Sequence, residues 1–168
     1  QKGNGEILVK GPNVMLGYYE NENATNEIFE DGWLHTGDIG RFDKKGFLHI
    51  TGRVKDMIVL DNGKKIFPHE IETLLNNSDI ITESFVYAKK ENKNLKLGVK
   101  LVYSEDNESL IGKSKDEIFS LLSEEVKKVN NEIPKYKHIQ YVTITTTPLI
   151  KTTTQKIKRF EEMKHIDE

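Results

Sequence analysis

Three segments of the sequence hold the charged side chains whose types and spacing could do chemistry. They read Gly-Trp-Leu-His-Thr-Gly-Asp at 32–38, Gly-Arg-Val-Lys-Asp-Met-Ile-Val-Leu-Asp-Asn-Gly-Lys-Lys-Ile-Phe-Pro at 52–68 with Glu-Ile-Glu at 70–72, and Lys-Thr-Thr-Thr-Gln-Lys-Ile-Lys-Arg at 151–159. A carboxylate can accept hydrogen bonds from two hydroxyl groups, an arginine fork can hold sugar or phosphate oxygens, and a lysine can stabilise developing negative charge. Each segment alone is a weak signal, so the interpretation depends on their order along the chain.

The common catalytic motifs are absent from the sequence. It has no Gly-x-Ser-x-Gly elbow and no glycine-rich phosphate loop that leads into Lys-Ser/Thr. Cysteine is absent too, which excludes disulfides, a thiol nucleophile and cysteine-ligated metals. The histidines show no metal-ligand spacing and are expected to be structural or surface residues. They are His35, His49, His69, His138 and His165. We therefore assign no metal ligand.

In order and spacing, the three segments resemble the late motifs of the adenylate-forming superfamily. This superfamily includes acyl-CoA synthetases, peptide-synthetase adenylation domains and beetle luciferases. The upstream residues Gly5-Glu6-Ile7, Gly11 and Gly17-Tyr18-Tyr19 are similar to the motif that precedes these three in the family. The form Gly-Arg-x-Lys-Asp-x-Ile-Val-Leu, followed by Asn-Gly-Lys and Pro-x-Glu-Ile-Glu, looks most like long-chain fatty acid–CoA ligases. One departure is Gln155, because many relatives have glycine just before the lysine of the third motif.

The resemblance implies an ATP-dependent ligase. Such an enzyme activates a fatty acid or another carboxylate as acyl-AMP, releases pyrophosphate, and then transfers the acyl group to CoA. ATP, Mg²⁺ and CoA are expected for the complete enzyme, with the metal ligands outside this chain. In the family, a large N-terminal domain binds ATP and acid, and a small C-terminal lobe rotates between the two half-reactions.

The resemblance also assigns roles to individual residues. Asp38 matches the aspartate that accepts hydrogen bonds from the ribose hydroxyls, and Arg53 matches an arginine that faces the same nucleotide. Lys55 lies at the hinge position, and Gly63 lies in the turn that meets the CoA tunnel. Lys156 matches the catalytic lysine, which bridges the carboxylate and the nucleotide in the first half-reaction. For Gly63 a second interpretation stays open, because Asn-Gly turns need glycine for positive φ alone.

The elements that must position these residues follow from apolar periodicity and turn signals. Strands are expected at 6–9, 38–42, 47–50, 57–60, 64–67, 81–88, 96–103 and 141–145. Residues 23–29 suit a short helix. Pro68 suits the first position of a second helix, and Ser114 with Glu117 forms a capping-box pattern before a third. The third helix should bury its apolar face, which comprises Ile118, Leu121, Leu122, Val126 and Val129. The polar, basic tail from Lys151 indicates a frayed end on composition alone.

Composition excludes several classes of function. The 25 basic and 27 acidic residues give a net charge of −2, so the basic excess typical of nucleic-acid binding is missing. No apolar run approaches the roughly 20 residues that span a bilayer, and peripheral membrane association is left open. The lack of cysteine is consistent with a cytoplasmic protein.

Together these features predict an α+β fold. Residues 1–54 are expected to be the strand-rich end of the N-terminal domain, and residues 55–168 a mobile sheet-and-helix C-terminal lobe. The chain is thus expected to be a fragment that is inactive without the missing N-terminal domain. Two alternatives remain: an adenylation domain that loads a carrier protein, and a binding module without catalysis.

Overall fold

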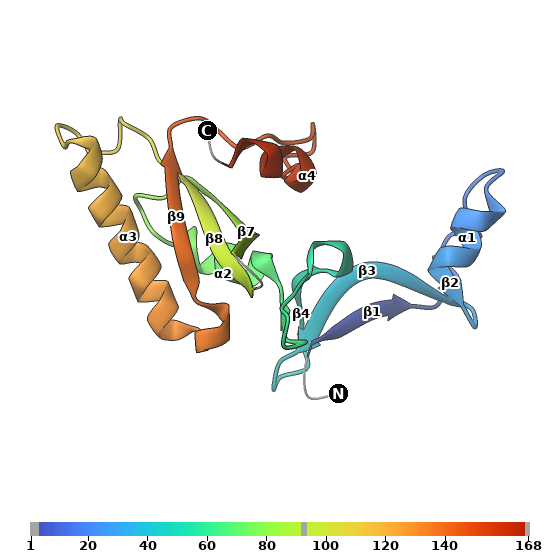
Figure 1. Cartoon of the computed structure of the whole chain (residues 1–168). Coiled ribbons are helices and arrows are strands. Elements are labelled where there is room, and N and C mark those ends of the chain that lie inside the picture. Colours follow the sequence, from blue (N-terminus) through green and yellow to red (C-terminus); the bar gives the residue numbers. More distant parts are fainter. Residues whose placement is uncertain (1–3, 92–93, 167–168) are drawn as a thin grey trace. The chain divides into compact units, whose positions relative to one another are not determined.

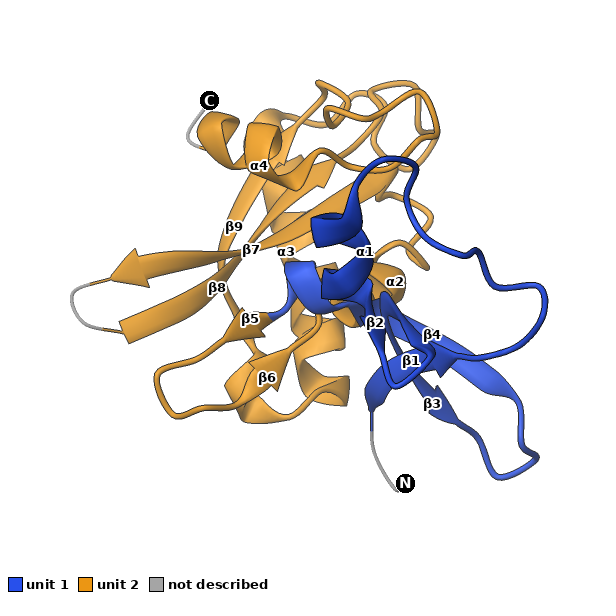
Figure 2. Cartoon of the chain, turned by 90° about the vertical axis from the view of Figure 1, so that its right-hand side faces the viewer, with its two compact units in different colours: residues 1–57 blue, residues 58–168 orange. Residues whose placement is uncertain are grey.

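The computed structural model describes residues 4–91 and 94–166. The chain divides into two compact units, residues 1–57 and residues 58–168, coloured blue and orange in Figure 2. The 54/55 boundary expected from the sequence lies inside a short 3-10 helix, η1 (Val54–Asp56), which follows the last strand of the first unit.

The first unit is an antiparallel sheet centred on one long strand, β3, with which β1, β2 and β4 all pair (Figure 1). The strands are β1 (Gly5–Val9), β2 (Phe29–Glu30), β3 (Trp33–Phe42) and β4 (Leu48–Arg53), and α1 (Glu22–Ile28) precedes β2. β3 starts earlier than the predicted 38–42 because Leu34 pairs with both β1 and β2. The pairing with β1 joins distant segments. The pairing with β2 is a local hairpin across Asp31-Gly32, both with positive φ, and this turn signal is missing from the predicted elements.

The second unit combines a two-stranded ribbon, a three-stranded sheet and helices. Its elements are β5 (Ile58–Val59), β6 (Lys65–Ile66), α2 (Pro68–Leu75), β7 (Glu83–Glu91), β8 (Asn94–Val102), α3 (Lys115–Glu132), η2 (Lys135–Lys137), β9 (Ile139–Thr145), α4 (Arg159–Glu162) and η3 (Met163–His165). In the larger sheet, β8 is the middle strand, antiparallel to β7 and parallel to β9. The predicted α+β class is confirmed.

The helix starts follow the predicted signals. Pro68 occupies the first turn of α2, where its missing N–H costs no hydrogen bond. Ser114 caps α3 in a complete capping box, with Glu117 N–H bonded to the serine hydroxyl and the Glu117 carboxylate bonded to Ser114 N–H. Four of the five predicted apolar residues of α3 are buried, and Leu121 is half-buried.

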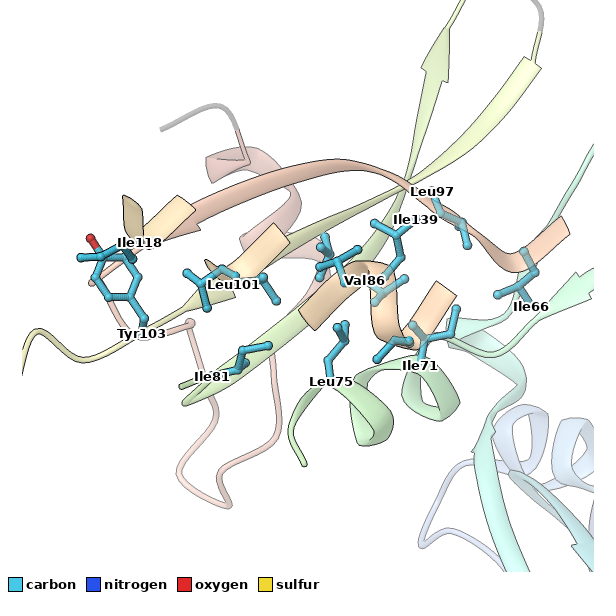
Figure 3. Packing of buried hydrophobic residues seen from close by; sticks show 14 of the residues in the cluster. Ile66, Ile71, Leu75, Ile81, Val86, Leu97, Leu101, Tyr103, Ile118 and Ile139 are labelled. Carbon is cyan, nitrogen blue, oxygen red and sulfur yellow. The ribbon is translucent and has the colours of Figure 1, made fainter. Parts of the chain in front are cut away.

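The two faces of the β7–β8–β9 sheet carry different partners. On β8, Leu97, Val99 and Leu101 belong to the main apolar cluster, which α2 and α3 help to form. Figure 3 shows Leu97 and Leu101 pointing into this cluster. We call this side the helix face. The alternate residues Lys100 and Val102 point to the other side, as the two-residue period of a strand requires.

The C-terminal segment covers that other side, which we call the tail face. Leu149 and Ile166 pack there against Phe85 and Tyr87 of β7, with Ile157 at the edge of the cluster. α3 and α4 accordingly lie on opposite sides of the sheet in Figure 1. Composition alone would suggest a frayed tail, but residues 149–166, which include the third motif, pack on the sheet and end in α4 and η3.

Candidate active site

Asp38 and Arg53 are brought together by the β3–β4 pair. They are register partners, and Arg53 Nε donates to Asp38 Oδ1 at 2.9 Å. The side chains remain 35% and 52% exposed, respectively. Because an exposed ion pair contributes little to stability, a ligand with hydroxyl or anionic groups can compete for both side chains.

The segment before Asp38 is held by Glu6 of β1. Glu6 Oε1 accepts the N–H of Gly37 at 3.0 Å, and its Oε2 contacts His35 Nδ1 at 2.9 Å. Gly37 has φ of +71°, a conformation that favours glycine. The Thr36 hydroxyl donates to a β1 carbonyl at 2.8 Å and accepts Asp38 N–H at 3.1 Å. The glycine and threonine of the motif thus fix the backbone that carries Asp38.

The carboxylates around His35 raise its pKa. The hydrogen bond that the imidazole donates to Glu6 is the main cause of the raised pKa, and the negative charges of Glu6 and Glu30 add to it. Because the pKa is higher in the folded state than in the unfolded state, protonation of His35 stabilises the fold. This stabilisation is complete at pH values below the ordinary histidine pKa. This contribution is lost as pH rises through the raised value.

Lys55 is an exposed residue of η1, between β4 of the first unit and β5 of the second. Its backbone lies in a single 3-10 turn, closed by Met57 N–H on the Val54 carbonyl at 3.3 Å. Such a short connection has few hydrogen bonds to break when backbone dihedrals change.

Gly63 lies in the turn of the β5–β6 ribbon. Its N–H donates to the Leu60 carbonyl at 2.8 Å, and Leu60 N–H donates to the Lys64 carbonyl at 2.9 Å. Gly63 has φ of +76°, and no atom lies within 4 Å of the position that a Cβ would occupy. The turn requires glycine for its backbone and leaves that backbone open to a ligand, so both sequence interpretations are compatible with this geometry.

Lys156 lies on a hairpin-like segment, residues 151–158, which we call the lysine loop. Lys151 and Ile157 form an antiparallel bridge at its base. Inside it, Thr152 N–H donates to the Lys156 carbonyl at 2.8 Å, and Lys156 N–H donates to the Thr152 hydroxyl at 3.1 Å. The backbone of Lys156 is thus fixed while its side chain is exposed.

Three ion pairs attach the lysine loop and α4 to the rest of the second unit. They are Lys151–Glu83 at 2.5 Å, Lys100–Glu162 at 3.0 Å and Arg159–Glu72 at 2.6 Å. Glu72 lies on α2 beside β7, where its second carboxylate oxygen accepts Val86 N–H at 2.9 Å. The Glu72 and Glu162 side chains are nearly fully buried, so the ion pairs that these two glutamates form are shielded from solvent.

Sequence reasoning missed these anchoring residues. Glu72 is the second glutamate of Pro-x-Glu-Ile-Glu, and its spacing next to Ile71 and Leu75 on the buried side of α2 was a usable signal. Lys100 falls at an alternate position of a strand, which usually indicates exposure, and Glu162 lies in the polar tail. For these two residues no local signal was present.

Gly63 and Lys156 lie on opposite sides of the second unit. Ile66 of the ribbon belongs to the helix-face cluster, and Ile58 and Leu60 pack against the same cluster. Ile157, next to Lys156, packs on the tail face. The β7–β8–β9 sheet therefore separates the two candidate residues.

Within residues 4–91 and 94–166, no group of three or more His, Cys, Asp or Glu side chains could hold a metal ion. These residues do not fit a Mg²⁺ site. Nor does the described part of the chain contain a helix that is long and apolar enough to cross a membrane.

Residues 55–165 match the family model of the AMP-binding enzyme C-terminal domain. The chain belongs to this family. Curated relatives of this AMP-binding C-terminal domain include 2-succinylbenzoate–CoA ligases of Bacillus cytotoxicus, 46% identical over 87 residues, and Bacillus cereus strain ATCC 10987, 45% identical over 89 residues. The alignments cover 52% and 53% of this chain and 18% of each relative.

Solved structures agree with the fold. o-Succinylbenzoate CoA synthetase (MenE) from Bacillus subtilis, in complex with its acyl-adenylate, superposes with a TM-score of 0.76 at 30% identity, covering 95% of this chain and 30% of that one. The amide bond synthetase McbA from Marinactinospora thermotolerans gives a TM-score of 0.81 at 20% identity, over 99% of this chain and 32% of that one. The predicted membership of the adenylate-forming superfamily is confirmed. The narrower prediction of a long-chain fatty acid ligase finds no support in these relatives.

Proposed function

We propose that this chain is the C-terminal part of an ATP-dependent acid–thiol ligase. In the first half-reaction, a carboxylate oxygen attacks the α-phosphorus of ATP, which forms acyl-AMP and releases pyrophosphate. In the second, the CoA thiol attacks the acyl carbon, loses its proton and releases AMP. Residues 1–54 would be the end of the large N-terminal domain, and residues 55–168 the mobile lobe.

The observation that carries this proposal is the placement of Gly63 and Lys156 on opposite faces of one sheet. A single active site can meet only one of these faces at a time. Lys156 would serve adenylation and the Gly63 turn would serve thioester formation, so the lobe must turn between the two steps. Lys55, in the short connection η1, is the proposed hinge.

Asp38 and Arg53 would hold the nucleotide. The Asp38 carboxylate can accept both ribose hydroxyls, and the Arg53 guanidinium can bind ribose or phosphate oxygens without losing its proton. Their ion pair keeps the two side chains adjacent before the nucleotide arrives. Lys156 would place its ammonium where negative charge develops on the carboxylate and the α-phosphate.

For the acid, we propose 2-succinylbenzoate as the first substrate to test, because the curated relatives carry that name at 44–46% identity. A long-chain fatty acid, which the motif pattern indicated, is the second candidate. For the acceptor, CoA is favoured over a carrier protein. The adenylation domain of a carboxylate reductase from Mycobacterium chelonae is only 21% identical to this chain and supports the fold alone.

The test is Lys156→Ala in the complete enzyme. Exchange of labelled pyrophosphate into ATP reports the first half-reaction, and CoA consumption from supplied acyl-adenylate reports the second. Removing one preorganised charge typically costs about 10²–10³ in rate, so exchange should fall by that factor. Thioester formation should change by less than about twofold, since Lys156 has no role in that step.

Lys158→Ala is the matched control. Lys158 is an exposed lysine of the same loop, and its salt bridge with Glu161 is also exposed. Lys151 and Arg159 are unsuitable controls because their ion pairs anchor the loop. Equal losses in Lys156→Ala and Lys158→Ala, or equal damage to both half-reactions, would contradict the proposed role.

A further inference from the structure

The Glu162 carboxylate joins the lysine loop to the middle of the sheet. Its Oε1 pairs with Lys100 Nζ at 3.0 Å, and its Oε2 accepts Ile150 N–H at 2.9 Å. The Lys100 and Glu162 side chains are only 7% and 3% exposed. Lys100 also donates to the His165 carbonyl at 2.7 Å. One buried group therefore contacts β8 and the residue that immediately precedes the loop.

Ile150 is held from both sides of its peptide backbone. Its N–H is bonded to Glu162, and its carbonyl accepts Lys158 N–H at 2.8 Å. Lys158 ends the lysine loop, so this residue pair closes the loop at its base. Displacement of Ile150 would shift the bridge between Lys151 and Ile157, and with it the backbone of Lys156.

Stability alone does not explain a buried ion pair at this position. Replacing such a pair with apolar residues of similar size is often neutral or stabilising, since both charges must be removed from water. Apolar side chains would attach the tail to the sheet equally well. The carboxylate adds a second acceptor oxygen, which is aimed at Ile150 and cannot be supplied by an apolar residue.

We propose that Glu162 is a positioning residue for Lys156. By accepting Ile150 N–H from a site fixed by Lys100, it sets where the lysine loop leaves the tail face. This inference rests on the proposed role of Lys156 in adenylation. Glu162 acts through the loop backbone and touches no substrate.

Two paired variants of the complete enzyme separate this role from charge burial. Lys100→Met/Glu162→Gln removes both charges and keeps a carbonyl acceptor for Ile150. Lys100→Met/Glu162→Met removes both charges and the acceptor with a side chain of similar length. Both variants leave no buried unpaired charge, so charge burial does not distinguish them. They differ in the oxygen that accepts Ile150 N–H and in the amide N–H groups that glutamine adds. The thioester step and thermal unfolding of each variant report whether the enzyme is folded.

The Gln variant should retain pyrophosphate exchange, and the Met variant should lose at least about tenfold in kcat, because small misplacements of a reacting group are costly. Thioester formation should be the same in both variants. When Lys156→Ala is added to both paired variants, their difference in pyrophosphate exchange should disappear. Amide hydrogen exchange at Lys156 should be faster in the Met variant.

The inference would be overturned if the two paired variants had equal rates of pyrophosphate exchange while Lys156→Ala lowered that rate. The proposed function would then remain intact. A difference that persists without Lys156, or that affects both half-reactions alike, would show a structural role and also overturn it. Normal exchange in Lys156→Ala would overturn the proposed function itself, and the inference would fail with it.

Discussion

At the scale of single residues, Gln155 departs from the resemblance in a way that the structure explains. Many adenylate-forming enzymes have glycine just before the catalytic lysine, and Gln155 has φ of +62°. The position needs a left-handed backbone, which closes the turn in which Gln155 N–H donates to the Thr152 carbonyl at 2.9 Å. A side chain there carries strain that glycine lacks.

We predict that Gln155→Gly raises the free energy of unfolding by about 0.5–1 kcal/mol, because relief of left-handed strain exceeds the added chain entropy. Gln140→Gly is the matched control. Gln140 is an exposed residue inside β9, where glycine weakens a strand. The same chemical change should therefore have the opposite sign at the two positions in urea unfolding. Destabilisation at both positions would contradict the strain argument.

Motifs selected candidate residues from the sequence, whereas residues whose contacts are nonlocal could not be selected. Asp38 and Arg53 were chosen separately from two motifs, and the β3–β4 register places them in contact. Glu162 could not be selected from the sequence as a candidate positioning residue, because its buried ion pair is with Lys100, more than sixty positions earlier in the chain. The roles of Asp38, Arg53, Lys55, Gly63 and Lys156 stay predictions.

At the scale of elements, a substitution in the β5–β6 ribbon tests the proposed approach of CoA to the Gly63 turn. We predict that Gly63→Leu slows thioester formation by at least about tenfold, because a branched side chain would occupy the backbone approach to the ligand. Adenylation should be spared, since the ribbon lies on the helix face, away from Lys156. CoA consumption from supplied acyl-adenylate, compared with pyrophosphate exchange, measures this difference.

Gly112→Leu provides the control for backbone strain. Gly112 shares the φ of +76° and the open surroundings of Gly63, and it lies in the same unit. Both substitutions should lower the free energy of unfolding by a similar amount, about 1–2 kcal/mol. If Gly112→Leu slows thioester formation as much as Gly63→Leu, the glycine serves the turn alone.

Element prediction succeeded where the signal is local. The capping box at Ser114, the proline at the start of α2 and the Asn-Gly turn each depend on neighbouring residues, and each was found. The first half of β3 was missed although Asp31-Gly32 is a local hairpin signal. The short helices α4 and η3 were missed because their anchoring contacts, such as Lys100–Glu162, join distant segments. The N-terminal part of β9 was missed in the same way, since Ile139 pairs with β8.

At the scale of the whole molecule, we predict that this chain alone binds ATP weakly and has no ligase activity. Asp38 and Arg53 supply two contacts, which are too few to offset the entropy of association. The alignments to curated relatives cover only 18% of their length, so under the proposed function most of the nucleotide-binding surface would belong to the rest of the enzyme. Calorimetry with ATP and pyrophosphate release with 2-succinylbenzoate or a fatty acid measure this. A micromolar dissociation constant or steady turnover would contradict it.

Strand β8 should tolerate insertions and deletions poorly. Leu97, Val99 and Leu101 face the helices while Lys100 and Val102 face the tail, so one strand encodes both sides of the sheet. Insertion or deletion of a single codon within 97–102 would exchange these sides and place a lysine in the apolar cluster. A substitution in this strand changes one side chain and leaves the others on their faces, so the strand should tolerate substitutions better than changes in its length.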